Sequence, residues 1–238
     1  MDRVNDHFYS CILNVTPATM RGAVTVIYAP VSHDPVVSES CASVLSDVEM
    51  QRAGHFANEH DKSQFEQRRA FRRFCGATVL KLPNSLSLVP FEETAKGRPY
   101  LPELANTWFS FSSCRFGFLG AWSSTHGVGV DIEDQSRELD TAELAQHFFS
   151  AVEANAVEST SDLERLRFFF QLWSLKEAAL KSIGEGLPFG LDTFEFELEP
   201  EIRFVRVPTK FGGLNQFSAQ TIETTGHCVA AVVLRNPV

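Results

Sequence analysis

Segments with the composition of β-strands alternate with long amphipathic segments along this 238-residue chain. Alternation of this kind predicts the α/β (α+β) class, in which small sheets pack with helices. Both halves begin with strand and helix, so we expect two subdomains, residues 1–124 and residues 125–238. The expected strands are 23–29, 108–112, 117–123 and 128–133, with further strands between 194 and 234, and the expected helical regions are 46–82, 141–157 and 162–183.

Composition and charge narrow the class of protein. Apolar residues make up 44% and charged residues 21% of the chain, which is typical of a soluble globular protein. The net charge of −9 argues against general nucleic-acid binding, which depends on an excess of lysine and arginine. No apolar run approaches the roughly 20 residues that a membrane span needs, and the polar start at residues 1–7 does not resemble a signal peptide.

The cysteines indicate a reducing environment. The five of them are odd in number, widely spread and without a CxxC pair. We therefore expect neither a disulfide framework nor a structural zinc site. The expected location is the cytoplasm, with no membrane association. The cysteines are Cys11, Cys41, Cys75, Cys114 and Cys228.

One strand in the middle of the chain carries two carboxylates on the same face. Alternate side chains of a strand share a face, so Val128, Val130 and Ile132 are expected to point into a core while Asp131 and Glu133 lie opposite. The Cα atoms of the two acids are separated by roughly 7 Å. Either the acids face solvent at a strand end, or they bind a hard cation such as Mg²⁺, which prefers oxygen ligands.

A stripe along the helix expected at 162–183 carries an acid and a base. Trp173, Glu177 and Lys181 are spaced at i, i+4 and i+8, which places them on one side of the helix. Glu177 and Lys181 can form an ordinary surface ion pair. The segment before them is strongly apolar, however, so the two side chains can also be partly buried, where acids and bases acquire chemical roles.

A third segment is basic. Arg68 and Arg72, and likewise Arg69 and Arg73, are spaced at i and i+4 in the helical region at 46–82. These arginines form either a solvated helix face or a wall that faces an anion.

Together these segments resemble the signature of the Sfp-like 4′-phosphopantetheinyl transferases. The family motif G-(I/V)-D-(I/V)-E matches residues 129–133, and the motif W-x-x-K-E-A-x-x-K matches residues 173–181. The upstream motif G-(K/R)-P is present as Gly97-Arg98-Pro99. Each motif alone is weak, whereas the three in this order at the family's spacing are specific. The resemblance covers most of the chain from about residue 45 to residue 196.

The resemblance implies a fold, a reaction and a set of site residues. The fold consists of two pseudo-symmetric halves with coenzyme A in the cleft between them. In the reaction, a serine of an acyl or peptidyl carrier protein attacks the β-phosphate of coenzyme A and 3′,5′-ADP leaves. Mg²⁺ is implied at Asp131, Glu133 and Glu177. The implied catalytic residues are Glu177, which accepts the serine proton directly or through water, and Lys181. Donor contacts are implied at Arg52, Lys96, Gly97, Arg98, Pro99, Ser112, Ser113 and Lys176.

The chain departs from the family pattern at the residues that hold the donor. Ser113 stands where the family has a histidine against the 3′-phosphate, in a segment that usually reads F-(N/S)-x-S-H-S. Glu49 occupies the place of a usual lysine, and Gln64 lies near a usual arginine. A charge-assisted hydrogen bond contributes about 1.5–3 kcal/mol, so these losses weaken coenzyme A binding unless other cations compensate. Candidates to compensate are Lys62, Arg68 and Arg98.

Three interpretations of this departure follow. The protein uses coenzyme A with substitute anchors, or it uses another donor such as dephospho-coenzyme A or a different pyrophosphate or acyl thioester. In the third interpretation it binds a carrier or a nucleotide without transfer. The pattern predicts poor discrimination between coenzyme A and dephospho-coenzyme A, or a preference for the latter, because Ser113 brings no charge and Glu49 would repel a dianion. A monomer is expected, since both halves lie in one chain.

Overall fold

The structure is a computed structural model, and it describes residues 24–82, 86, 89–222, 224 and 227–236. Residues 1–7, Cys11 and Ala23, on which expectations were stated above, lie outside this part. The elements in chain order are β1 Thr25–Pro30, α2 Pro35–Ala42, α3 Asp47–Ala53, α4 Glu59–Leu80, β2 Glu92–Glu93, β3 Pro99–Tyr100, β4 Trp108–Cys114, β5 Gly117–Ser123, β6 Gly127–Asp134, α5 Thr141–Phe148, α6 Ala151–Ser159, α7 Asp162–Ser182, β7 Glu195–Glu197, β8 Arg203–Arg206, β9 Phe217–Ile222 and β10 Cys228–Arg235.

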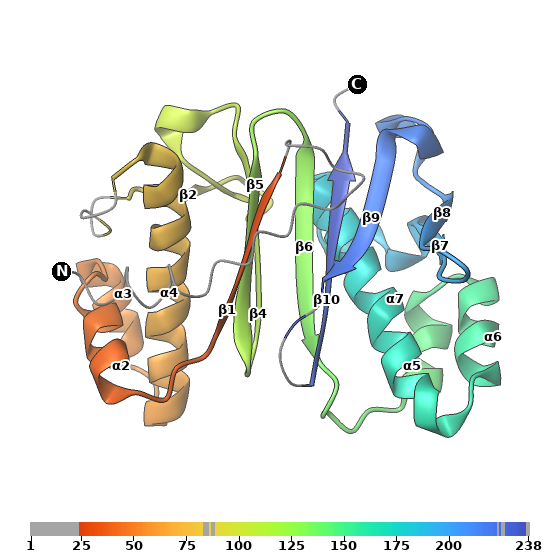
Figure 1. The fold of residues 1–238 in the computed structure, drawn as a ribbon, viewed down its shortest axis with the longest axis horizontal. Coiled ribbons are helices and arrows are strands. Elements are labelled where there is room, and N and C mark those ends of the chain that lie inside the picture. The colour runs from red at the N-terminus through yellow and green to blue at the C-terminus, as the bar shows by residue number, and fades with distance from the viewer. Residues whose placement is uncertain (1–23, 83–85, 87–88, 223, 225–226, 237–238) are drawn as a thin grey trace.

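The molecule is layered, with helices on the outside and two sheets between them (Figure 1). The first sheet has the antiparallel order β1–β5–β4, and α2, α3 and α4 lie on its outer side. The second has the antiparallel order β6–β10–β9, and α5, α6 and α7 lie on its outer side. This confirms the α+β class, with small sheets packed against helices. The subdomain boundary between residues 124 and 125 stays a prediction.

Three clusters of buried apolar side chains fill the spaces between the layers, because each sheet is packed on both of its faces. In β1, Val26 and Tyr28 belong to the cluster between the two sheets. Their neighbours Ile27 and Ala29 belong to the cluster under the helices of the first half. A third cluster lies between the second sheet and its helices. The period-two alternation of a strand therefore supplies both faces.

Strand β6 follows the same rule, and this positions the two acids. Val128, Val130 and Ile132 belong to the cluster between the sheets, as predicted. Gly129 lies on the opposite face, against α7, where an added Cβ would be only 1.8 Å from the carbonyl oxygen of Ala178. A glycine is therefore required for α7 to lie this close to β6. Asp131, two residues further on, shares that face.

Three helical segments differ from the expectation. The region 46–82 holds two helices, because α3 ends at its C-cap Gly54 and Asn58 caps the start of α4. The region 141–157 is broken into α5 and α6, because Ser150 and Glu153 form a capping box that begins a new helix. Helix α2 was not expected, although Asp34 accepts a hydrogen bond from the Val36 amide at 2.9 Å and Pro35 occupies the first turn. Within the described ranges, no helix is both long enough and apolar enough to cross a membrane.

Candidate functional site

Among the three acids predicted to bind a metal, Asp131 has two side-chain hydrogen bonds, from Ser112 and from Lys181. It is buried, and its Oδ1 accepts hydrogen bonds from the Ser112 hydroxyl and from the Lys181 ammonium, both at 2.7 Å. Lys181 also donates to the carbonyl oxygen of Val130 at 3.2 Å. Strand β4, strand β6 and helix α7 thus each bring one predicted residue to the same point. Glu177 and Lys181 are not partners in a simple surface ion pair, because Lys181 turns to Asp131.

Asp131 repels the negative charge of the two other acids, Glu133 and Glu177. Burial raises the pKa of Glu133 to about 7, with repulsion from Asp131 adding to the effect and Arg137 opposing it. The carboxylate of Glu133 accepts from Arg137 at 2.6 Å. Burial also raises the pKa of Glu177, against the attraction of Lys181. The charged forms of both glutamates therefore lack full compensation within the protein.

The expected metal centre is not preformed. In the described part of the chain, no group of three or more His, Cys, Asp or Glu side chains is arranged to hold a metal ion. A metal at Asp131, Glu133 and Glu177 therefore stays a prediction. The residues nevertheless suit a hard cation, because the donors are carboxylate oxygens and Oδ2 of Asp131 is buried without a hydrogen-bond partner in the structure.

A cavity of about 220 Å³ collects predicted residues from both halves. Its first-half wall carries the G-(K/R)-P segment and its second-half wall carries the stripe of α7, and Arg72 of α4 also reaches it. Residues more than 75 positions apart in the sequence thus face one space. The predicted residues that line it are Lys96, Gly97, Arg98, Pro99, Glu177 and Lys181.

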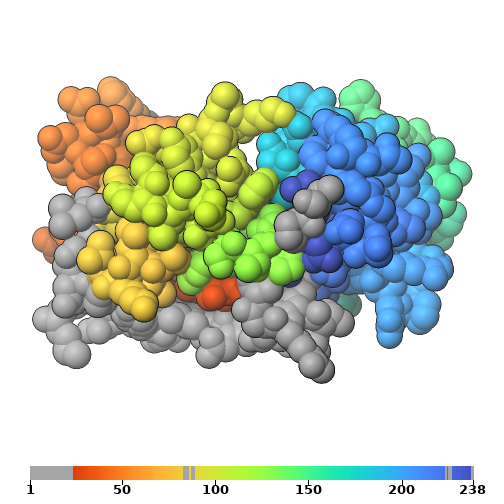
Figure 2. All heavy atoms as spheres, turned by 90° about the horizontal axis from the view of Figure 1, so that it is seen from above, coloured from red at the N-terminus to blue at the C-terminus, as the bar shows by residue number. Residues whose placement is uncertain are grey.

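The segment before β3 bridges the two halves. Lys96 forms an ion pair at 2.7 Å with Glu185, which follows the carboxyl end of α7. Figure 2 shows this segment reaching across toward α7. Gly97 has a φ of +80°, a conformation that favours glycine, and its amide donates to the Thr94 carbonyl at 2.8 Å. Arg98 lies over the Trp108 ring, 4.0 Å from its centroid, and burial lowers the Arg98 pKa.

A second cavity, of about 370 Å³, adjoins the first and shares Arg72 and Phe111 with it. Ser112 and Ser113 line this second cavity together with four arginines and one carboxylate, that of Glu93. The arginines are Arg52, Arg68, Arg69 and Arg72. The basic face of α4 is therefore a wall that faces a cavity, and not a fully solvated surface.

Three of these guanidinium groups have little compensating negative charge. Arg52 and Arg68 both lie over the Phe65 ring, at 5.4 and 5.7 Å from its centroid. Arg72 has a loose contact of 3.5 Å with the exposed Glu93, and its buried Nε has no hydrogen-bond partner among the described residues. Burial and the neighbouring Arg69 lower the pKa of Arg72 to about 10. Positive charges crowded in this way favour an anionic ligand.

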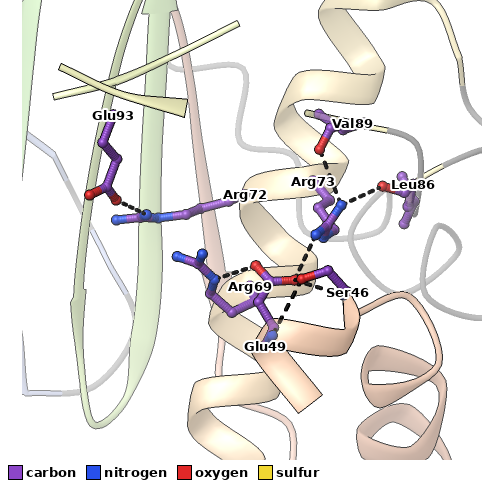
Figure 3. Close-up of polar contacts among 8 residues, drawn as sticks. All are labelled: Ser46, Glu49, Arg69, Arg72, Arg73, Leu86, Val89 and Glu93. Atoms are coloured by element: carbon purple, nitrogen blue, oxygen red, sulfur yellow. Dashed lines mark hydrogen bonds and ion pairs between the residues drawn. The ribbon is translucent and has the colours of Figure 1, made fainter. Parts of the chain in front are cut away.

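Glu49, expected to repel a dianion, is occupied elsewhere (Figure 3). Its carboxylate accepts from Arg69 and from Arg73, each at 2.6 Å, and from the Ser46 amide at 2.9 Å. Burial alone would raise the Glu49 pKa, but the Ser46 amide and the two arginines lower it to about 2. The residue does not line the cavity that contains Ser113. The structure therefore removes the reason to expect repulsion from Glu49.

The placement of Lys176 corrects the prediction that it contacts the donor. Its side chain is fully buried in the second half, 2.6 Å from Glu153, and it donates to the carbonyl oxygens of Leu191 and Phe194. Lys176 continues the apolar stripe of Leu172 and Leu180, at i−4 and i+4, which are both buried. That stripe was the sequence signal for a core position.

The structure also shows which residues the motifs did not indicate. Arg72, which lines both cavities, appeared in the sequence only as one member of the basic helix face. Glu185, the partner of Lys96, lies beyond the last motif and carries no signal of its own. Gln64 lines a further cavity with Arg68, Ser113 and Arg115, and its side-chain amide donates to the Arg115 carbonyl at 2.8 Å.

Comparisons with known proteins point to one family. Residues 127–232 match the model of the 4′-phosphopantetheinyl transferase superfamily. A Synechocystis sp. protein assigned to the 4′-phosphopantetheinyl transferases is 34% identical over 155 residues, which cover 63% of this chain and 61% of that protein. A 4′-phosphopantetheinyl transferase of Nostoc sp. is 28% identical over 200 residues, covering 82% of this chain and 81% of that protein.

The comparisons differ in extent. The chain spans less than two thirds of the length of the Synechocystis relative, namely 61%. Among solved structures, the holo-acyl-carrier-protein synthase of Thermotoga maritima matches with a TM-score of 0.39 and 22% identity, covering 46% of this chain and 62% of that chain.

Proposed function

We propose that the chain transfers the 4′-phosphopantetheine group of coenzyme A to a serine of an acyl or peptidyl carrier protein, because residues 127–232 match the model of the 4′-phosphopantetheinyl transferase superfamily and the similar proteins are such transferases. The observation that carries the proposal is the cavity between the halves, which places the G-(K/R)-P segment opposite Glu177 and Lys181. One chain supplies both walls of this cavity, so a monomer is sufficient for the proposed activity. We propose the cytoplasm as its location.

The side chains of α7 suit the proposed transfer. Glu177 accepts the proton of the carrier serine, and its raised pKa brings it closer to the neutral range in which a general base works well. Lys181 offsets charge on the donor pyrophosphate. Mg²⁺, held by Asp131, Glu133 and Glu177, would neutralise further pyrophosphate charge and align the attack. Ser112 orients Asp131 through its hydrogen bond of 2.7 Å.

Arginines of α3 and α4 replace the missing donor anchors. In the second cavity, Arg52, Arg68 and Arg72 surround Ser113, which stands where the resemblance implies a histidine. Several weakly paired guanidinium groups supply the positive charge that Ser113 lacks, and a guanidinium can bind two oxygens of one phosphate. We therefore propose coenzyme A as donor, in place of the dephospho-coenzyme A preference that the sequence alone suggests.

Transfer to a carrier protein tests the proposed function. Purified chain is incubated with apo-carriers of the fatty-acid, polyketide and nonribosomal-peptide classes, coenzyme A and Mg²⁺, and the carrier mass is measured. We expect one carrier class to gain the mass of phosphopantetheine. Glu177→Gln should lower the rate by about 10²- to 10⁴-fold, since a positioned general base contributes this much.

A matched control uses Lys62, which the sequence offered as a compensating cation but which lines neither of the two cavities. Lys62 is partly exposed on α4 and pairs with Glu59 at 3.4 Å. Lys62→Ala should therefore transfer at the rate of the unchanged protein. No mass gain with any carrier class, from protein that unfolds cooperatively, would contradict the proposed function.

A further inference from the structure

Two cysteines from opposite halves meet at one end of the contact between the two sheets. The Sγ atoms of Cys114, the last residue of β4, and Cys228, the first residue of β10, are 3.4 Å apart, and both residues are half-buried thiols. The two positions are separated by 114 residues in the sequence. Spacing along the chain therefore gave no indication of the pair.

The surroundings hold this pair in place. Arg115, the neighbour of Cys114, forms an ion pair at 3.0 Å with Asp134, the register partner of Cys228 in β6. The rings of Phe116 and His227 lie 6.3 Å apart at the same end. Both cysteines pack against the cluster between the sheets. Contacts from both halves thus keep the two sulfur atoms together.

We propose that Cys114 and Cys228 form a reversible dithiol–disulfide site that joins the two halves covalently. A disulfide bond needs an S–S distance of about 2.05 Å, so the two sulfur atoms must approach by only about 1.4 Å from their present 3.4 Å. Neither cysteine belongs to the proposed transfer machinery, so this proposal is independent of the proposed function.

The two thiols have different roles in the exchange. A hydrogen bond from the S–H of Cys228 stabilises the thiolate form of Cys114 and lowers the Cys114 pKa to about 7. The amides of Phe116 and Gly117 act in the same direction, and burial acts against them. Cys114 is therefore the attacking thiolate at neutral pH. The same contact raises the pKa of Cys228, so Cys228 keeps its proton until the second step.

A small-molecule disulfide such as oxidised glutathione is the oxidant. The Cys114 thiolate attacks one sulfur of the oxidant, forms a mixed disulfide and releases one glutathione thiolate. Cys228 then loses its proton and attacks Sγ of Cys114, and a second glutathione thiolate leaves. In total, the protein dithiol is oxidised by two electrons and one oxidised glutathione becomes two reduced molecules. The other described cysteines, Cys41 and Cys75, are fully buried.

Peptide mapping of the unchanged protein tests the site. The full chain is treated with oxidised glutathione at pH 7.5, remaining thiols are alkylated and the protein is digested with trypsin. Trypsin does not cut before proline, so Cys114 falls in the peptide 97–115 and Cys228 in the peptide 211–235, each with a single cysteine. We expect these two peptides to be joined, and dithiothreitol to separate them.

Thermal melting provides a second readout. A bridge across a loop this long restricts the unfolded chain, so the oxidised protein should melt at least about 5 °C above the reduced protein. Cys228→Ser should abolish the difference, whereas Cys75→Ala, which removes a buried thiol, should keep it. Glutathione retained on Cys114 with Cys228 unreacted, or cross-links distributed among all the cysteines, would overturn the proposal.

Discussion

At the scale of single residues, two buried glutamates perform the same task in the two halves. Glu49 is the third residue of α3, where it forms a capping box with Ser46, and it pairs with Arg69 and Arg73 of the long helix α4. Glu153 is the third residue of α6, where it forms a capping box with Ser150, and it pairs with Lys176 of the long helix α7. Each glutamate ties a short helix to a long one, which is a stabilising role distinct from the chemistry of the cavities.

Lys176→Met tests this structural role. Removing one partner leaves Glu153 buried without its cation, so the free energy of unfolding should fall by about 3–5 kcal/mol. Urea unfolding measures the loss, and the double variant with Glu153→Gln should regain part of it. Donor affinity of the folded protein, measured by calorimetry, should not change. A tenfold loss of donor affinity at full stability would instead restore Lys176 to the donor site.

Glu49 should give the stability a dependence on acid pH. The folded pKa of about 2 lies below the ordinary value of 4.5, so the carboxylate stabilises the fold above pH 4.5 and loses this contribution as the pH falls toward 2. Solvent screening reduces the roughly 3 kcal/mol that this difference in pKa corresponds to, so we expect a contribution of about 1–3 kcal/mol at neutral pH. Glu49→Gln should therefore be less stable than the unchanged protein at pH 7, with a gap that narrows below pH 4.5.

Urea unfolding at a series of pH values measures this gap. A gap that stays constant between pH 7 and pH 3 would contradict the assignment, because it would mean that the ionisation of Glu49 does not contribute to folding. That result would point to packing of the side chain as its contribution.

At the scale of elements, the contact between β6 and α7 positions the acids. The alternation of Val128, Val130 and Ile132 was sufficient to predict the buried face of β6, because a strand has only two faces. It could not predict that Lys181 turns to Asp131, since that contact depends on how α7 crosses the strand. The break between α5 and α6 was missed because the capping signal of Ser150 lies inside an otherwise apolar run.

Gly129→Ala tests the close approach of α7 to β6. A Cβ atom 1.8 Å from a backbone oxygen forces the helix away from the strand, so stability should fall by at least about 1–3 kcal/mol. Transfer activity should fall as well, because the same contact positions Asp131 relative to Lys181. Thermal melting and the carrier assay measure the two effects.

Gly54→Ala is the matched control for this substitution. Gly54 has a helical φ of −65°, and its added Cβ would lie at an ordinary 3.4 Å from the nearest atom. This variant should melt at the temperature of the unchanged protein or up to about 4 °C above it, since neither strain nor overlap arises and alanine restricts the unfolded chain more than glycine does. Equal melting temperatures for Gly129→Ala and the unchanged protein would show that α7 does not need the glycine.

At the scale of the whole molecule, the two halves each supply one wall of the cavity that Glu177 and Lys181 line. The motifs indicated a family and hence a cleft, and the cavity between Arg98 and Lys181 agrees with that expectation. The basic face of α4 was left open as solvated or anion-facing. The sequence could not decide between a solvated and an anion-facing helix face. The answer depends on how Phe65 of α4 packs with Phe111 and Ser113 of β4 around the arginines, and these two elements are far apart in the sequence.

The relative use of two donors tests the account most directly. The ratio kcat/KM for transfer to a carrier protein is measured with coenzyme A and with dephospho-coenzyme A, using the unchanged protein and Arg68→Ala. The account predicts at least a tenfold preference for coenzyme A, equivalent to about 1.4 kcal/mol, which Arg68→Ala largely removes and Lys62→Ala does not. Equal kcat/KM for the two donors, or no transfer from either, would contradict it.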